Sequence, residues 1–334
     1  MKRNMKHWLQ DYLQSPVKKA MPILSFPGVQ LLEKTVDELV RDGHLQALCM
    51  KAIADRYDMG ISVSLMDLSV EAEAFGAEVH YSEDDVPTMH GALITDEDQA
   101  DALEVPQVGA GRTGECIKGI KEAKELITDR PVVAGIVGPY TLAGRLLDMT
   151  EIMILCYEEP EMVETVLEKA TTFLIEYAKA FKAAGANGIL MAEPVAGLLS
   201  PDLEEEFSSP YVKKIVDAVQ DERFAVIYHN CGDNAHLMLD SITATGCAAY
   251  HFGNSMDLER DIISHLPSDT LVMGNIDPAG TLRMGTEKTV KEETLALLER
   301  CSKYPNFVMS SGCDIPPATP LENLDAFCKA VQEF

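Results

Sequence analysis

The sequence predicts an α/β protein folded as a TIM (β/α)8 barrel. Short, almost wholly apolar segments alternate with longer helical patterns along the 334 residues, as in parallel strands covered by helices. Eight such segments occur, the number that closes this barrel. An open doubly wound sheet is the alternative, but the chain contains no GxGxxG or Walker phosphate motif. The predicted strands span residues 22–26, 61–66, 131–137, 189–193, 224–229, 247–251, 271–275 and 307–311.

The helical patterns follow the strands in the expected order. An amphipathic helical extension is predicted over residues 1–20, and residues 77–112 look like an irregular excursion with hairpin-like pieces. No repeat, low-complexity segment or flexible linker divides the chain, so residues 1–334 are expected to form a single domain. Helices are predicted over residues 33–40, 43–57, 113–128, 150–184, 202–219, 234–245, 256–264, 287–302 and 320–332.

Composition excludes several classes of partner. With 28 basic and 54 acidic residues the net charge is −26, which argues against a nucleic acid or an anionic membrane surface as partner. No apolar run approaches the roughly 20 residues of a membrane span, and no secretory signal is recognised at the N-terminus. We therefore expect a cytoplasmic protein whose eight cysteines are reduced thiols.

Polar residues that can bind metals or substrates stand at or directly after the ends of five consecutive predicted strands. Active sites of TIM barrels form at these carboxyl ends, so the side chains should converge. The residues are Glu193, His229 with Cys231, His251, Asn275 with Asp277, and Cys313.

His229 and Cys231 are two positions apart, so in an extended chain their side chains point to the same side. Together with Cys313 they offer one nitrogen and two sulfur ligands, a set that suits Zn²⁺ with a fourth position left for substrate. Glu193 could supply a displaceable fourth ligand. The alternative is that the cysteines only pack as small apolar residues.

Longer motifs around these residues resemble the uroporphyrinogen decarboxylase superfamily, and most of all its methylcobamide:thiol (coenzyme M) methyltransferase branch. The resemblance covers essentially the whole chain. Its most specific part is the last motif, where a cysteine sits in a fixed frame of glycine and prolines. The motifs are MDLSVEAEAFG (66–76), GPYTLAG (138–144), HNCG (229–232), GNIDP (274–278) and GCDIPPATPLEN (312–323).

This resemblance implies a zinc ion on His229, Cys231 and Cys313, and transfer of a methyl group from a methylated corrinoid to a small thiol such as coenzyme M. The chain has no match to the corrinoid-binding signature Asp-x-His-x-x-Gly, so the corrinoid is expected on a separate partner protein. The related decarboxylases often dimerise, which points to a homodimer by analogy alone, and the sequence itself leaves the oligomeric state open.

Porphyrinogen decarboxylation is the first alternative, and a non-catalytic corrinoid- or metal-binding barrel is the second. Asp67 keeps the place of the decarboxylase aspartate and is a candidate catalytic residue beside Glu193. The family's arginine-rich stretch, however, reads SFPGVQLL (25–32) and has no basic residue. Contact with substrate or support of the metal ligands is expected of His251, Asn275 and Asp277. Asp277 precedes a proline and could instead cap a helix.

Overall fold

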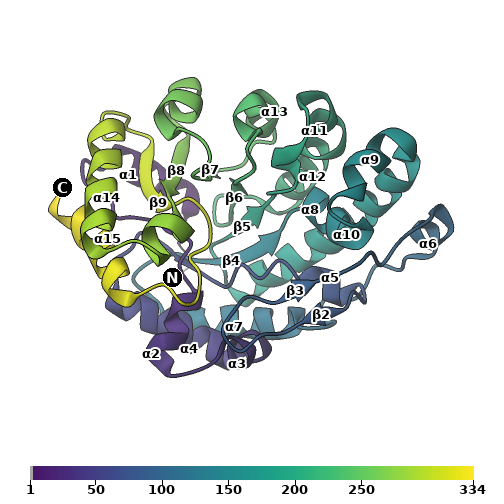
Figure 1. The fold of residues 1–334 in the computed structure, drawn as a ribbon, viewed down its shortest axis with the longest axis horizontal. Helices are drawn as coiled ribbons and strands as arrows, with labels where there is room; N and C mark the ends of the chain where they lie inside the picture. Colours follow the sequence, from purple (N-terminus) through teal and green to yellow (C-terminus); the bar gives the residue numbers. More distant parts are fainter. Residues whose placement is uncertain (1–2) are drawn as a thin grey trace.

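A curled parallel sheet of seven strands forms the centre of the computed structural model, which describes residues 3–334 (Figure 1). Strands neighbour one another in the order β1-β4-β5-β6-β7-β8-β9, and every pair is parallel. The predicted α/β architecture of the TIM-barrel type is therefore confirmed. The strands are β1 (Ser62–Val63), β4 (Val132–Val137), β5 (Gly188–Ala192), β6 (Ala225–Asn230), β7 (Ala249–Phe252), β8 (Leu271–Ile276) and β9 (Phe307–Ser311).

The first predicted strand, residues 22–26, is wrong: this segment lies between β9 and β1 without forming a ladder. Its start bonds to β9 from Met21 N to the Met309 carbonyl (2.9 Å), from Ile23 N to the Ser311 hydroxyl (3.1 Å) and from the Ser310 hydroxyl to the Met21 carbonyl (2.9 Å). Pro22, between them, has no N–H to donate, so regular pairing is interrupted. The segment thus fills the gap in the barrel wall without being a strand.

Side chains alternate between the two faces of the strands. On β5, Leu190 and Ala192 belong to the inner core, whereas Ile189 and Met191 pack outward against the helices. On β6, Ile227 points inward and Tyr228 outward. This alternation decides which polar residues at the strand ends can face the barrel interior.

Helices surround the sheet as expected, with some shorter or divided (Figure 1). The predicted helix 150–184 is interrupted before Pro160, and 202–219 is interrupted before Ser209-Pro210, because proline cannot donate a helical hydrogen bond. The N-terminal helix ends at Gln14 rather than residue 20, and residues 1–2 of its predicted range lie outside the described residues. The α-helices are α1 (Met5–Gln14), α2 (Val29–Leu32), α3 (Val36–Arg41), α4 (Gly43–Arg56), α5 (Val70–Ala74), α6 (Glu97–Ala102), α7 (Thr113–Leu126), α8 (Pro139–Leu147), α9 (Glu151–Glu158), α10 (Pro160–Ala184), α11 (Pro201–Phe207), α12 (Ser209–Val219), α13 (Leu239–Ala244), α14 (Glu287–Cys301) and α15 (Leu321–Glu333).

The excursion between β1 and α7 contains a small antiparallel hairpin of β2 (Val79–His80) and β3 (Thr88–Met89), as the sequence suggested. The predicted helix 256–264 is instead a π-helical turn over Leu258–Ile262 followed by a 3-10 turn. Within residues 3–334 there is no helix with both the length and the hydropathy needed to cross a bilayer.

Candidate metal centre

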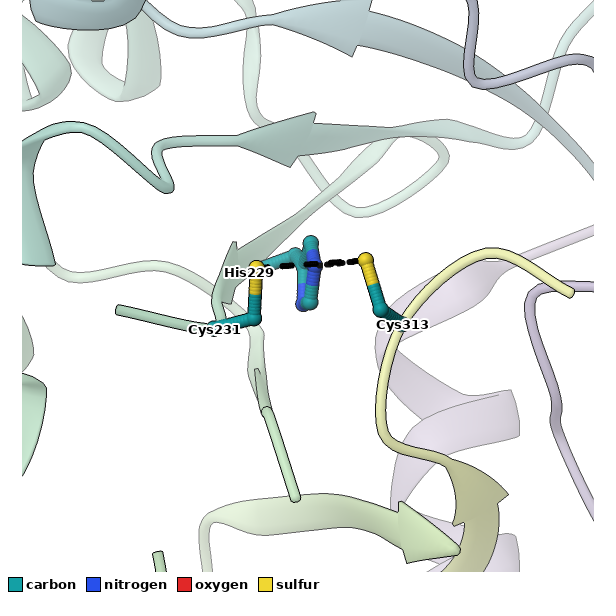
Figure 2. Close-up of side chains that lie close together, drawn as sticks. All are labelled: His229, Cys231 and Cys313. Carbon is teal, nitrogen blue, oxygen red and sulfur yellow. Dashed lines mark hydrogen bonds between the residues drawn. The ribbon is translucent and has the colours of Figure 1, made fainter. Parts of the chain in front are cut away.

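His229, Cys231 and Cys313 come together at the carboxyl end of the barrel (Figure 2). His229 lies two positions after Ile227 on β6 and therefore faces inward, and Cys231 directly follows that strand. Cys313 stands two residues after the end of β9, across the opening. The three ligand atoms all lie within 4.8 Å of one another.

Their spacing fits a tetrahedral zinc ion. The two sulfurs are 3.8 Å apart, and Cys313 Sγ is 3.5 Å from His229 Nε2. A tetrahedral Zn²⁺ with bonds of about 2.3 Å to sulfur and about 2.05 Å to nitrogen separates two sulfurs by about 3.8 Å and sulfur from nitrogen by about 3.6 Å. A disulfide would instead require about 2.05 Å, and both residues are free thiols.

The two thiols share one hydrogen bond, in which Cys313 donates to Cys231. This bond lowers the pKa of the Cys231 thiol below its usual value. The same bond, with burial, raises the pKa of Cys313 to about 12. A divalent cation that binds both sulfurs must displace the proton of this bond.

A chain of buried hydrogen bonds supports the other side of the His229 ring. His229 Nδ1 is 2.8 Å from His251 Nδ1, and His251 Nε2 is 2.7 Å from the Ser310 hydroxyl. Ser310 in turn donates to the Met21 carbonyl at 2.9 Å. His251 and Ser310 have no solvent-exposed surface. We call this series from Met21 to His229 the histidine relay.

The relay determines which nitrogen of His229 carries a proton. Because the only hydroxyl proton of Ser310 goes to Met21, its oxygen must accept from His251 Nε2–H. Burial lowers the pKa of His251 well below its usual value, so the ring is neutral and its Nδ1 accepts. His229 then donates from Nδ1, which leaves Nε2 to face the two sulfurs as a metal ligand.

A small cavity of about 50 Å³ opens beside the three ligands. Its wall is mainly apolar, and Asp314 is the one carboxylate that lines it. A site of this kind keeps bulk water away from one side of the ligand cluster while leaving room for a few substrate atoms. The apolar lining residues are Ile23, Met66, Leu68, Ala192 and Pro194.

Glu193 does not join the ligand cluster. It follows Ala192 by one position and therefore points away from the barrel interior, toward the start of α8. Its carboxylate accepts bonds from Tyr140 N (2.8 Å), Thr141 N (2.9 Å) and the Thr141 hydroxyl (2.7 Å). Burial raises its pKa to about 7 against the effect of these bonds. To serve as a fourth ligand, the carboxylate would have to leave this helix terminus.

Asp67 is engaged by a residue that sequence reasoning missed, Arg112. The Arg112 guanidinium pairs with both Asp67 and Glu73, and Asp67 also accepts from Ser69. Nearby Glu71 is 2% exposed, and burial raises its pKa to about 7. Arg112 could not be identified from sequence because it lies 45 residues from its partner, at the end of the irregular excursion.

Asn275 and Asp277 bind backbone groups of neighbouring loops. The Asn275 amide donates to the carbonyls of Gly253 and Met256 at 2.8 and 2.9 Å, which shapes the loop after β7. Asp277 accepts from Ala279 N and Gly280 N, both at 2.9 Å, and so caps the following turn. This arrangement matches the helix-cap alternative, and a substrate contact for either residue stays a prediction.

Comparison with known proteins finds relatives with two kinds of activity. A "Methylcobamide:CoM methyltransferase MtbA" from Methanosarcina acetivorans is 27% identical over 274 residues, covering 80% of this chain and 78% of its own. A "Uroporphyrinogen decarboxylase" from Anaeromyxobacter sp. is 25% identical over 309 residues, covering 89% of this chain and 87% of its own.

Among solved structures, a methyltransferase from Methanosarcina mazei matches with a TM-score of 0.86 and 26% identity, over 99% of both chains. The family model described as "Uroporphyrinogen decarboxylase (URO-D)" matches residues 16–334. With nearly the whole chain matched, this protein belongs to the uroporphyrinogen decarboxylase family.

Proposed function

We propose that this protein is a zinc-dependent methyltransferase that moves a methyl group from a methylated corrinoid to a small thiol such as coenzyme M. The observation that carries the proposal is the spacing of Cys313 Sγ from Cys231 Sγ and from His229 Nε2, which matches two edges of a zinc tetrahedron, with all three ligand atoms within 4.8 Å of one another. Three strong ligands beside a cavity leave a fourth position for a substrate sulfur.

When bound, Zn²⁺ would lower the pKa of a coordinated thiol so that the thiol is ionised at neutral pH. The chain's own residues prepare for this chemistry. Cys231 and Cys313 supply electron-rich sulfur, which keeps a thiolate substrate nucleophilic, and the histidine relay holds Nε2 of His229 free of its proton. The overall reaction forms a carbon–sulfur bond, breaks the cobalt–carbon bond and releases the thiol proton.

Glu193, after β5, and Asp67, after β1, are the two other proposed catalytic residues. With a pKa of about 7, Glu193 can hold or release a proton near neutrality, and as a displaceable fourth ligand it would leave the metal when the thiol binds. Asp67 keeps Arg112 in place beside the mouth of the barrel.

A separate protein that carries the corrinoid is the proposed methyl donor. Three large apolar side chains are exposed on loops that follow β5, β6 and β8, at the same end of the barrel as the metal centre. Exposed apolar residues at the rim of a functional opening support a docking surface for a protein. They are Leu198 (47% exposed), Leu237 (58%) and Met284 (75%).

Decarboxylation of a porphyrinogen is not favoured, although decarboxylases are among the relatives. A substrate with several carboxylate arms needs several cationic partners. Residues 25–32 contain no basic side chain, and Arg112 is already occupied by Asp67 and Glu73. In addition, two thiols that can bind a metal line the cavity. Porphyrinogen decarboxylation would need no metal ligand there.

Purified protein should be tested for zinc content and for conversion of free methylcobalamin to cob(I)alamin in the presence of small thiols. The absorbance change should require both zinc and thiol, and His229→Ala and Cys313→Ala should lose metal and activity. Cys247→Ala is the matched control because this buried free thiol lies outside the cluster. Absence of zinc and of methyl transfer with every thiol, or decarboxylation of uroporphyrinogen, would contradict the proposal.

A further inference from the structure

Asn230, the last residue of β6, is a fully buried amide. It stands between His229 and Cys231 in the chain, and its relative exposure is 0%. Side chains of β6 alternate, so Asn230 points outward on the face of Tyr228, whereas His229 points toward the barrel interior. An amide in this apolar outer layer lowers stability unless its polar atoms are hydrogen-bonded. The value of a polar residue at this position therefore lies in the bonds that the amide makes.

Both ends of the Asn230 amide are bonded, and one of these bonds spans Cys231. The Oδ1 atom accepts from the backbone N–H of Gly232 at 2.9 Å, and the Nδ2 atom donates to the Tyr228 hydroxyl at 3.0 Å. A side-chain oxygen that accepts from the N–H two residues further on forms an Asx turn, which bends the chain at the residue between them. Here that residue is Cys231, and the bond to Tyr228 fixes the orientation of the amide.

This turn begins where the ladders of β6 end. β6 pairs with β5 as far as His229 and with β7 as far as Asn230, so Cys231 lies beyond the last paired residue on both sides. The Asn230 carbonyl, just before Cys231, accepts from Gly253 N at 3.1 Å. Bonds at Asn230 and at Gly232 thus hold the backbone on both sides of the cysteine, and the main freedom left to the thiol is rotation of its own side chain.

A glycine of the loop after β5 packs against the same turn. A Cβ at Gly197 would lie 2.1 Å from Asn230 Oδ1 and 2.7 Å from the Cα of Gly232, so a larger residue there would displace the turn. The Gly197 carbonyl also accepts from Asn234 N at 2.9 Å, which ties the chain just after the turn to this loop. The amide of Asn230 is therefore enclosed by backbone and held against Gly232.

We propose that Asn230 is a positioning residue of the metal centre: its amide closes the turn over Cys231 and so holds that sulfur where it can bind the ion. The assignment rests on the proposed function in taking His229, Cys231 and Cys313 to be the metal ligands. The Cys231 sulfur lies 3.8 Å from that of Cys313, as expected for two sulfurs on one zinc ion, and opening the turn would change this distance (Figure 2). Residues that orient metal ligands typically contribute a factor of about 10 to 100 to metal affinity.

The first experiment titrates the full-length protein with Co²⁺, whose thiolate-to-metal charge-transfer absorbance reports the cysteines that bind it, and then measures zinc affinity by competition. Asn230→Leu keeps the approximate size of the side chain but cannot accept from Gly232 N. It should weaken metal affinity about 10- to 100-fold and shift the absorbance per bound metal toward that of Cys231→Ala. Asn230→Ser should restore part of both, because a serine hydroxyl can accept from the same N–H, although more weakly.

Asn306→Leu is the matched control. Asn306 is 1% exposed, and its amide donates to the carbonyls of Pro267 and Thr270 at 3.1 and 3.0 Å, at the amino end of β9 and away from the metal centre. Both leucine variants should lower the free energy of unfolding, but only Asn230→Leu should change metal affinity and absorbance. Tyr228→Phe leaves the bond from Gly232 N in place and should weaken metal affinity less than Asn230→Leu does.

Hydrogen–deuterium exchange of the metal-free protein reports on the turn without any metal. The Gly232 N–H should be protected in wild type and should exchange faster in Asn230→Leu but not in Asn306→Leu. If wild type binds Co²⁺ through two thiolates and Asn230→Leu does so with equal affinity and absorbance, the assignment is wrong while the metal site stands. If wild type binds neither Co²⁺ nor Zn²⁺ through its cysteines, the proposed function fails and the assignment fails with it.

Discussion

Replacing Ser310 by alanine should weaken zinc binding although Ser310 does not touch the metal ligands. The change removes the hydroxyl that accepts from His251 Nε2 at 2.7 Å. Because His251 has no exposed surface, its N–H would be left without an acceptor, which costs about 1–3 kcal/mol. The ring can avoid this cost by moving its proton to Nδ1, but that proton then faces His229 Nδ1, only 2.8 Å away.

His229 would in that case carry its own proton on Nε2, the nitrogen that faces the sulfurs. Zinc binding would require both rings to return to their original tautomers, so the same cost of about 1–3 kcal/mol becomes a loss of affinity of roughly 5- to 150-fold. The assay is competition for zinc with a chelator of known affinity. ¹⁵N-histidine NMR of the metal-free protein should show Nδ1–H for His229 in wild type and a changed tautomer in Ser310→Ala.

Ser311→Ala is the matched control for this experiment. Ser311 is the next residue of β9, is equally buried, and also bonds the segment that fills the barrel wall, through Ile23 N at 3.1 Å. Its hydroxyl makes no hydrogen bond to His251, so loss of that hydroxyl should reduce the free energy of unfolding but leave zinc affinity within about threefold. Equal zinc affinities for the two variants would refute the tautomer argument.

Three other outcomes are expected. Gly253→Ala should lower the zinc content, because the new Cβ would lie 2.5 Å from Cys231 Cβ and force that residue to shift. Gly144→Ala, whose Cβ would meet no atom nearer than 3.5 Å, should not lower it. Metal analysis of both variants decides this. Zinc affinity should decrease as the pH falls, by about a factor of ten per pH unit for each proton displaced. The reason is that Cys313, with its pKa of about 12, must lose its proton to bind the metal. A zinc affinity that does not change between pH 6 and 8 would contradict this prediction. Burial raises the pKa of Glu193 from 4.5 to about 7, so between these pH values the folded protein keeps a proton that the unfolded protein loses. The free energy of unfolding should therefore fall as the pH rises from 4.5 to 7. Urea titrations should show a smaller decline in Glu193→Gln.

Much of the fold could be predicted because parallel strands buried on both faces leave a clear apolar pattern. β4 to β9 fall within one or two residues of the predicted ranges. The failure at residues 22–26 has a local cause. The apolar content of that segment is the same as that of a strand, but Pro22 and Pro27 remove backbone donors, and the Ser311 side chain replaces a ladder bond.

The ligand cluster could be predicted because His229 and Cys231 have the spacing of one strand face and Cys313 follows another strand at the same level. The same parity argument, applied to Glu193, would have placed it on the outer face with Tyr228 and not with Ala192. The histidine relay could be only partly anticipated. His251 was a candidate, but its bond to His229 depends on the register between β6 and β7, which pairs these two residues and cannot be derived from either strand alone.

Arg112 illustrates what sequence patterns do not contain. It is a single arginine at the end of an irregular segment, and nothing in its sequence neighbours shows that it binds two carboxylates. Only the packing of distant segments brings it to Asp67 and Glu73.

X-ray absorption at the zinc edge, before and after addition of the thiol substrate, tests the central claim most directly. The account predicts two sulfur ligands and at least one imidazole nitrogen in the resting protein, and three sulfur ligands once the thiol is present. A protein that binds no zinc, or a sulfur count that stays at two when thiol is added, would contradict a metal site built to activate a thiol.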